Sequence, residues 1–136
     1  MKIALQISSP ALTIDYSDLS MIVLPGRDGI VGVLPKHALC LVDLQPGVVK
    51  LYKGEDIAKR YLVRNGVANI KPEKCIITVE EFHELDEFDP KVLEENIKRY
   101  HNDLGGMDIE VEERIIEAKI KATEKMLEVA RQHFKK

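Results

Sequence analysis

The chain has 136 residues, of which 45% are hydrophobic, and its 20 basic and 23 acidic side chains give a formal net charge of −3. A chain of this length can bury one hydrophobic core with a small appendage, so it needs no metal or disulfide scaffold to fold. The slightly acidic balance gives no electrostatic reason to expect nucleic-acid binding, and no apolar run reaches the length of a membrane span. We therefore expect a soluble, intracellular protein.

Up to Glu81 the sequence predicts an all-β domain. Short runs rich in Val, Ile, Leu and Thr are separated by turn residues at roughly 8–12-residue spacing, as in a β-sandwich or barrel. Asn65-Gly66 predicts a hairpin turn between two strands, because both residues tolerate the positive φ of a type I′ turn. We expect strands over residues 2–7, 12–16, 19–24, 30–34, 39–44, 47–52, 57–63, 66–71 and 75–80.

A glycine-rich segment that begins at Gly26 has the glycine spacing of a phosphate-binding loop. It lacks the Walker lysine, and a strand-like apolar run follows it in place of a helix whose N-terminus could bind an anion. We therefore expect Gly26 and Gly29 to shape a turn between two strands. Arg27 and Asp28 then lie at the exposed tip of that turn, where a partner could bind.

After Phe88 the hydrophobic period changes from that of strands to that of helices. Asp89 before Pro90 supplies an N-cap and the first-turn proline that helices favour. A second helix is expected over residues 108–134, after Gly105-Gly106, and the two would form an antiparallel hairpin. Such a hairpin either covers a sheet face or detaches to recognise another protein, and the residues alone do not choose between these roles. The apolar positions of the pair include Leu93, Ile97, Tyr100, Ile116, Ile120 and Leu127.

The sequence shows no catalytic constellation. Its four histidines lie in different predicted elements, with no pair at the spacing of metal ligands. His37 follows a Pro-Lys step after a strand, so we expect a structural hydrogen bond or an interface contact there in preference to a catalytic role. Cys40 and Cys75 lie far apart in apolar stretches and are expected to be buried free thiols. We expect neither an enzyme nor a metal site.

The order of these motifs resembles one known family. The motif Val-Leu-Pro-Gly-x-x-Gly-x-x-Gly-Val-Leu-Pro-x-His-Ala occupies residues 23–38, Leu-x-Pro-Gly-Val occupies residues 44–48, and Asn-Gly-Val occupies residues 65–67. Together with the two-helix tail, they resemble the epsilon subunit of the F-type ATP synthase over essentially the whole chain. The resemblance implies a ten-strand N-terminal β-sandwich over residues 1–85 and a C-terminal antiparallel α-helical hairpin over residues 86–136.

In function, the resemblance implies a non-catalytic subunit of the central rotor. The sandwich would bind the gamma subunit and the c-subunit ring, so that ion flow is coupled to ATP synthesis. The hairpin would either fold against the sandwich or extend into the alpha/beta catalytic head, where it brakes ATP hydrolysis. The chain would then lie at the cytoplasmic face of the bacterial inner membrane, peripherally and without insertion.

The resemblance also assigns residues to these roles. The loop that docks on gamma and the ring would contain Arg27, Asp28, Ile30 and His37. The apolar residues that exchange partners in the switch would be Leu93, Ile97, Tyr100, Ile116, Ile120 and Leu127. Contacts to an acidic loop of the beta subunits would come from Lys119, Lys121, Lys125 and Arg131, for which simple solvation is an equal alternative.

The chain departs from the family pattern at several positions. Ile30 occupies a position that is often acidic in the family, Lys36 replaces a common glycine, and Leu39 replaces the usual proline.

Some family members bind ATP on the folded hairpin through an Ile/Leu-Asp-x-x-Arg-Ala motif, but here Val92 stands at the arginine position. Asp89 and Arg99 remain as candidates, and regulatory ATP binding is not favoured, so we expect no cofactor. The competing hypothesis is a free-standing β-sandwich that binds a small ligand under a helical lid.

Overall fold

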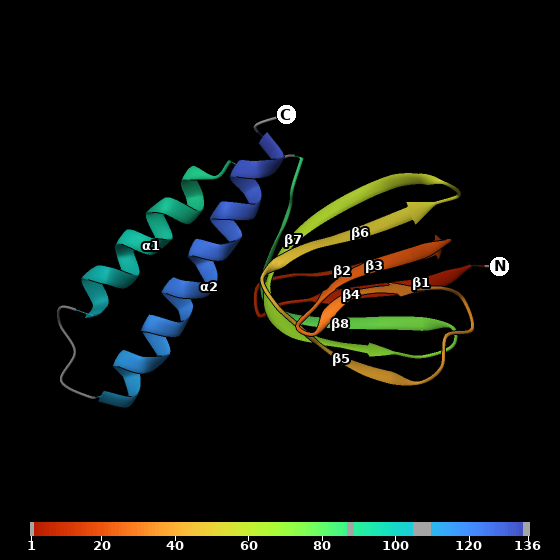
Figure 1. The fold of residues 1–136 in the computed structure, drawn as a ribbon, viewed down its shortest axis with the longest axis horizontal. Coiled ribbons are helices and arrows are strands. Elements are labelled where there is room, and N and C mark those ends of the chain that lie inside the picture. Colours follow the sequence, from red (N-terminus) through yellow and green to blue (C-terminus); the bar gives the residue numbers. More distant parts are fainter. Residues whose placement is uncertain (1, 87–88, 105–109, 135–136) are drawn as a thin grey trace.

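The structure, a computed structural model, describes the backbone of residues 2–86, 89–104 and 110–134. A β-sandwich occupies one side of the molecule and two packed helices the other, with α2 lying between α1 and the strands (Figure 1). The elements are β1 (Ile3–Ser8), β2 (Thr13–Leu19), β3 (Met21–Gly26), β4 (Gly29–Val33), β5 (Cys40–Leu44), β6 (Gly47–Lys53), β7 (Asp56–Ile70), β8 (Lys74–Glu84), α1 (Lys91–Leu104) and α2 (Glu110–Phe134).

The predicted sandwich followed by a helical pair is confirmed, with eight strands in the described part of the chain where ten were expected. The strands run in the order β2-β1-β8-β7-β5-β3-β4, and β6 closes the fold by pairing with both β3 and β7. Every pairing is antiparallel except that of β1 with β8, which is parallel. The residue pattern predicted nine strands and the resemblance implied ten. The count is one below the residue pattern because β7, with 15 residues, is one continuous strand where two were predicted.

The predicted hairpin at Asn65-Gly66 is wrong, because these residues lie inside β7. Before them β7 pairs with β6, and from Gly66 onward it pairs with β5. Asn65 has a φ of 45°, a left-handed conformation that Asn tolerates better than most residues. A Cβ on Gly66 would overlap the carbonyl oxygen of Thr78 on β8. The pair therefore allows β7 to change partners without reversing the chain.

The main core consists of the buried side chains that alternate with less buried ones along the strands. In β1, Ile3, Leu5 and Ile7 are fully buried and the residues between them are half-buried, as the two-residue period of a strand requires. The core receives further buried residues from the other strands, among them Leu19, Ile22, Leu24, Leu44, Leu51, Ile70 and Ile77.

The start of α1 follows the predicted capping chemistry. The carboxylate Oδ1 of Asp89 accepts a hydrogen bond from the backbone N–H of Lys91 at 3.0 Å, so Asp89 caps the helix as expected. The carbonyl of Pro90 accepts from Leu93 N at 3.1 Å. The predicted glycine stop at 105–106 and the start of the second helix at 108 lie outside the described residues.

Candidate functional site

The first candidate site is the turn between β3 and β4. Arg27 and Asp28 form its exposed two-residue tip, as predicted. Two bonds tie this turn to β5: Arg27 N donates to the carbonyl of Asp43 at 2.8 Å, and Arg27 Nη2 donates to that of Leu44 at 3.4 Å. Ile30 follows the tip and is 83% exposed. The turn is therefore held in place by β5 and exposes two charged side chains and one apolar side chain.

His37 lies on a different connection, between β4 and β5. Its Nδ1 is 2.8 Å from the carbonyl oxygen of Ala38, and its backbone N–H donates to Leu34 at 3.2 Å. Lys36 before it has a φ of 67°, the left-handed conformation that favours glycine, and its N–H donates to Pro72 at 2.7 Å. The hollow beside the Arg27 turn, about 330 Å³ in volume, is lined by Arg27, Asp28 and Ile30 but not by His37.

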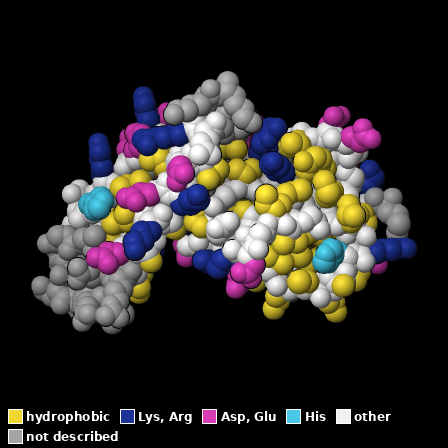
Figure 2. All heavy atoms as spheres, viewed as in Figure 1, with side chains coloured by type: hydrophobic (Ala, Val, Ile, Leu, Met, Phe, Trp, Pro, Cys, Tyr) yellow, Lys and Arg dark blue, Asp and Glu magenta, His cyan; other side chains and the backbone are white. Residues whose placement is uncertain are grey.

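Sequence reasoning missed apolar exposure on β5 and on the connection before it. Leu41 of β5 is 70% exposed and lines the hollow beside the Arg27 turn, whereas Leu34 and Leu39, 55% and 74% exposed, lie on the β4–β5 connection. Figure 2 shows hydrophobic side chains gathered over the sandwich. The sequence did mark Leu39 as unusual, because the family pattern has proline at this position. Whether the Leu39 side chain faces water or the core, however, depends on strand register, which the motif does not give.

The second candidate site is the junction between the sandwich and the helices. Its apolar part is a cluster in which Leu62 and Leu85 meet residues from both helices: Leu93 of α1 and Met126, Leu127 and Ala130 of α2. Ile97 packs at the edge of this cluster. Ile116 and Ile120 are buried outside it. The structure thus brings three of the predicted switch residues, Leu93, Ile97 and Leu127, into this apolar cluster.

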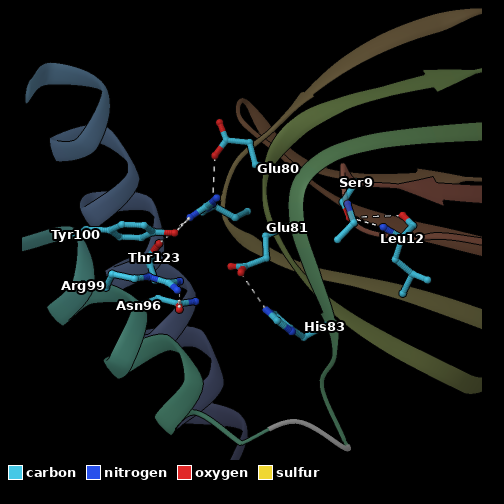
Figure 3. Close-up of polar contacts among 11 residues, drawn as sticks. Ser9, Leu12, Glu80, Glu81, His83, Asn96, Arg99, Tyr100 and Thr123 are labelled. Carbon is cyan, nitrogen blue, oxygen red and sulfur yellow. Dashed lines mark hydrogen bonds and ion pairs between the residues drawn. The ribbon is translucent and has the colours of Figure 1, made fainter. Parts of the chain in front are cut away.

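The polar part of the junction centres on Arg64 of β7, which the sequence analysis did not select. Its side chain is buried, its Nη1 donates to Tyr100 Oη of α1 at 3.2 Å and to Thr123 Oγ1 of α2 at 3.1 Å, and its Nε lies 3.1 Å from Glu80 Oε2 (Figure 3). The signal available in the sequence was an arginine directly after the apolar run Leu62-Val63. One side chain therefore joins two strands and two helices.

Two further side chains of β8 lie beside this arginine. Oε1 of Glu81 is 3.5 Å from Nε2 of His83 (Figure 3). The hydrogen bond from His83 lowers the pKa of Glu81, burial opposes this shift, and the charges of His83, Arg64 and Arg99 add to the lowering. Glu81 is therefore held as a carboxylate among cationic groups.

The four predicted cations of α2 are all exposed, and they differ in their partners. Nη2 of Arg131 lies 2.7 Å from Oε1 of Glu94, so this pair joins α2 to α1. Lys125 lies 3.8 Å from Glu128 on its own helix. Lys119 and Lys121 are exposed on the same helix.

The two candidates for an ATP site both have structural partners. Asp89 caps α1, and Arg99 Nη2 donates to Asn96 Oδ1 at 2.7 Å while the guanidinium lies 6.0 Å from the centre of the Tyr100 ring. Val92, at the arginine position of the motif, is 42% exposed. Within the described ranges, no three His, Cys, Asp or Glu side chains group as metal ligands.

Among the helices that the structure describes, neither is long and apolar enough to cross a membrane. The two cysteines differ from the expectation of two buried thiols, because Cys75 is buried and Cys40 is exposed near the start of β5. Cys40 lies next to the exposed Leu39 and Leu41 at the margin of the sheet, where an apolar run no longer guarantees burial.

Comparison with known proteins identifies the sandwich. The profile of the family described as "ATP synthase, Delta/Epsilon chain, beta-sandwich domain" matches residues 2–84, which is more than half of the chain. The chain belongs to this family.

Relatives along the full length carry the epsilon name. The ATP synthase epsilon chain of Rhodospirillum centenum is 29% identical over 133 residues, covering 94% of this chain and 91% of the relative. That of Granulibacter bethesdensis is 30% identical over 131 residues, covering 94% and 96%. The resemblance to the epsilon subunit is therefore confirmed, and with it the expectation of a non-catalytic subunit.

Solved structures share the fold at lower identity. A chain of the Euglena gracilis mitochondrial ATP synthase has a TM-score of 0.68 at 19% identity, with 98% of this chain and 81% of that chain covered. A chain in the central stalk and c-ring structure of the Tetrahymena thermophila mitochondrial ATP synthase has a TM-score of 0.57 at 14% identity, with 93% and 97% covered. Both chains share the fold of this chain.

Proposed function

We propose that the chain is a rotor subunit in the central stalk of an F-type ATP synthase, where it couples ion flow through the c-subunit ring to ATP synthesis. The observation that carries this proposal is the family match over the sandwich together with epsilon chains related over nearly their full length. The relatives are bacterial, so we place the chain peripherally at the cytoplasmic face of the inner membrane. Its partners there are the gamma subunit and the c-subunit ring.

The docking surface of the sandwich is the β3–β4 turn together with the exposed Leu41, which lines the hollow beside it. Ile30 exposes most of its side chain to water, and burying it against a partner would contribute roughly 25 cal/mol per Å² of apolar surface. Arg27 and Asp28 at the tip supply one cation and one carboxylate for polar contacts. His37, held by a local hydrogen bond on the next connection, forms a separate contact point.

The hairpin, residues 86–136, is a regulatory unit separate from the sandwich of residues 1–85. The described contact between the two includes one apolar cluster, the bonds of Arg64 and the partly exposed ion pair of Arg60 with Asp86, which is modest enough for the helices to leave the sandwich. Once extended, α2 would present Lys119, Lys121 and Lys125 to an acidic loop of the beta subunits. Arg131 would join them after losing Glu94.

Deletion of residues 89–136 tests this division of labour. The truncated chain keeps every strand and the main core, so we expect a folded sandwich that still assembles into the complex. ATP hydrolysis by the complex should rise, because the brake is missing. The matched control is the full chain, assembled and assayed in parallel. Unchanged hydrolysis with normal assembly would contradict the regulatory role, whereas failed assembly of a folded sandwich would contradict the division at residue 85.

A further inference from the structure

Arg64 is the one charged side chain that joins the sandwich to both helices in the described part of the chain. It is 6% exposed, and Thr123, which accepts one of its bonds, is fully buried. We propose that Arg64 is a latch that fixes the folded position of the hairpin on the sandwich. The regulatory meaning of this latch rests on the proposed function, but its effect on the hairpin position does not.

The chemistry of the contact explains why an arginine would serve as a latch. The apolar cluster around Leu62 and Leu85 favours contact with the helices but is not directional. The planar guanidinium holds its N–H groups in a fixed fork, so Tyr100 and Thr123 must both be in place for its Nη1 bonds to form. These two acceptors lie on different helices. Arg64 therefore sets the position of the helical pair as a unit.

The latch can open without leaving a buried charge. Glu80, on the same sheet, is about half exposed and stays beside Arg64 when the helices leave. Water can then bond the released guanidinium and both hydroxyls. In the closed state, by contrast, removal of one hydroxyl removes the acceptor of a buried N–H, which is a costly arrangement. The contact thus favours one closed position and still permits release.

Hydrogen exchange of the isolated full chain tests the latch. In Arg64→Met, which keeps an unbranched apolar stem, we expect backbone amides of α1 and α2 to exchange about tenfold faster, as for loss of a buried charge-assisted hydrogen bond. The sandwich strands should keep their protection. Arg60→Met is the matched control, because Arg60 lies on the same strand as Arg64. Its ion pair, with 3.7 Å between Nη1 and Oδ2, is with Asp86, which precedes both helices in the chain. Equal helix protection in the two variants would overturn the proposal.

Two substitutions that each remove a single hydroxyl group test the latch even if Arg64→Met also destabilises the sandwich. Thr123→Val and Tyr100→Phe each remove one hydroxyl with little change in shape. Each should speed helix exchange a few-fold in the natural background and have almost no effect in the Arg64→Met background, because the partner is already gone. Additive effects, or no effect of either change alone, would overturn the proposal.

ATP hydrolysis by the assembled complex tests the proposed brake separately from the latch. A weaker latch frees the hairpin to extend, so Arg64→Met should lower ATP hydrolysis relative to Arg60→Met, the opposite sign from deleting the hairpin. Faster helix exchange with unchanged hydrolysis would support the latch and contradict the brake. Unchanged helix exchange would overturn the latch whatever the hydrolysis rate.

Discussion

Arg131 of α2 and Glu94 of α1 form an ion pair, with 2.7 Å between Nη2 and Oε1. The two side chains are 58% and 44% exposed, so water and salt screen their attraction. The pair joins the two helices to each other. It therefore bears on the integrity of the hairpin, whereas the contacts of Arg64 and Leu93 bear on its position.

The first prediction concerns this ion pair. Arg131→Gln should lower the free energy of unfolding of the hairpin by about 0–1 kcal/mol, the usual range for exposed pairs, and the difference should shrink in high salt. Glu94→Gln should have an equal effect, and the double variant should cost no more than either single one. Urea unfolding followed by helical circular dichroism measures all three. A loss of unfolding free energy well above this range would show that the pair is not screened by water as an exposed ion pair should be.

The second prediction concerns Leu93, which is fully buried in the cluster between helices and sandwich. Leu93→Ala should destabilise the docked hairpin by about 2–4 kcal/mol, because it removes packed methyl groups and leaves a cavity. The neighbouring Val92→Ala is a matched control, since Val92 is 42% exposed, and should change stability by less than about 0.5 kcal/mol. Similar unfolding curves for the two variants would show that the cluster does not hold the hairpin.

The third prediction concerns Gly66 in the middle of β7. Gly66→Ala should cost about 2 kcal/mol or more, because the new Cβ overlaps the backbone of β8 at Thr78. Gly32→Ala, at an exposed strand position with its nearest neighbour 4.0 Å away at Met21 Sδ, is the control and should be nearly neutral. Thermal unfolding of the two variants makes the comparison. A neutral Gly66→Ala would contradict the close approach of β7 and β8.

The fourth prediction separates the two thiols. Burial raises the pKa of Cys75 to about 12, so its thiolate is scarce at neutral pH, whereas Cys40 is exposed. A thiol reagent at pH 8 should label Cys40 in the native chain and reach Cys75 only after denaturation. Mass spectrometry of labelled peptides identifies the site. Fast native labelling of Cys75 would contradict its place in the core.

The fifth prediction concerns the pH dependence of Glu81. Because His83 and nearby arginines lower its pKa below 4.5 in the folded chain, the carboxylate stabilises the fold above pH 4.5. That contribution is lost as the pH falls through the lowered pKa. Glu81→Gln should therefore be less stable than the natural chain at pH 7, with a difference that narrows toward pH 3. Urea unfolding of both chains at the two pH values measures the difference, and a difference that does not change with pH would contradict the prediction.

Local chemistry was predictable where neighbours along the chain decide the structure. The cap at Asp89 and the turn at Arg27-Asp28 depend on residues within a few positions, and both formed as expected. At Asn65-Gly66 the same local logic failed, because pairing of β7 with β5, β6 and β8 outweighed the turn preference. A short motif cannot predict which distant segments will pair as strands.

The candidate sites show the same division. Ile30 could be named from its place in a motif, and it is 83% exposed, as a docking residue would be before its partner binds. Arg64 could not be named, because its importance arises only when strands and helices far apart in sequence meet. Cys40 was misplaced because burial at the margin of a sheet depends on what covers it.

The size of the chain in gently solubilised native membranes shows whether it works as a subunit of a large rotary complex. We expect the chain to migrate together with the ATP-hydrolysing complex in native electrophoresis. Ile30→Asp, which places a charge on the docking turn, should weaken this association more than Leu12→Asp at another exposed apolar site. A chain found only as a small free species would rule out the rotor subunit and favour a free-standing ligand-binding domain.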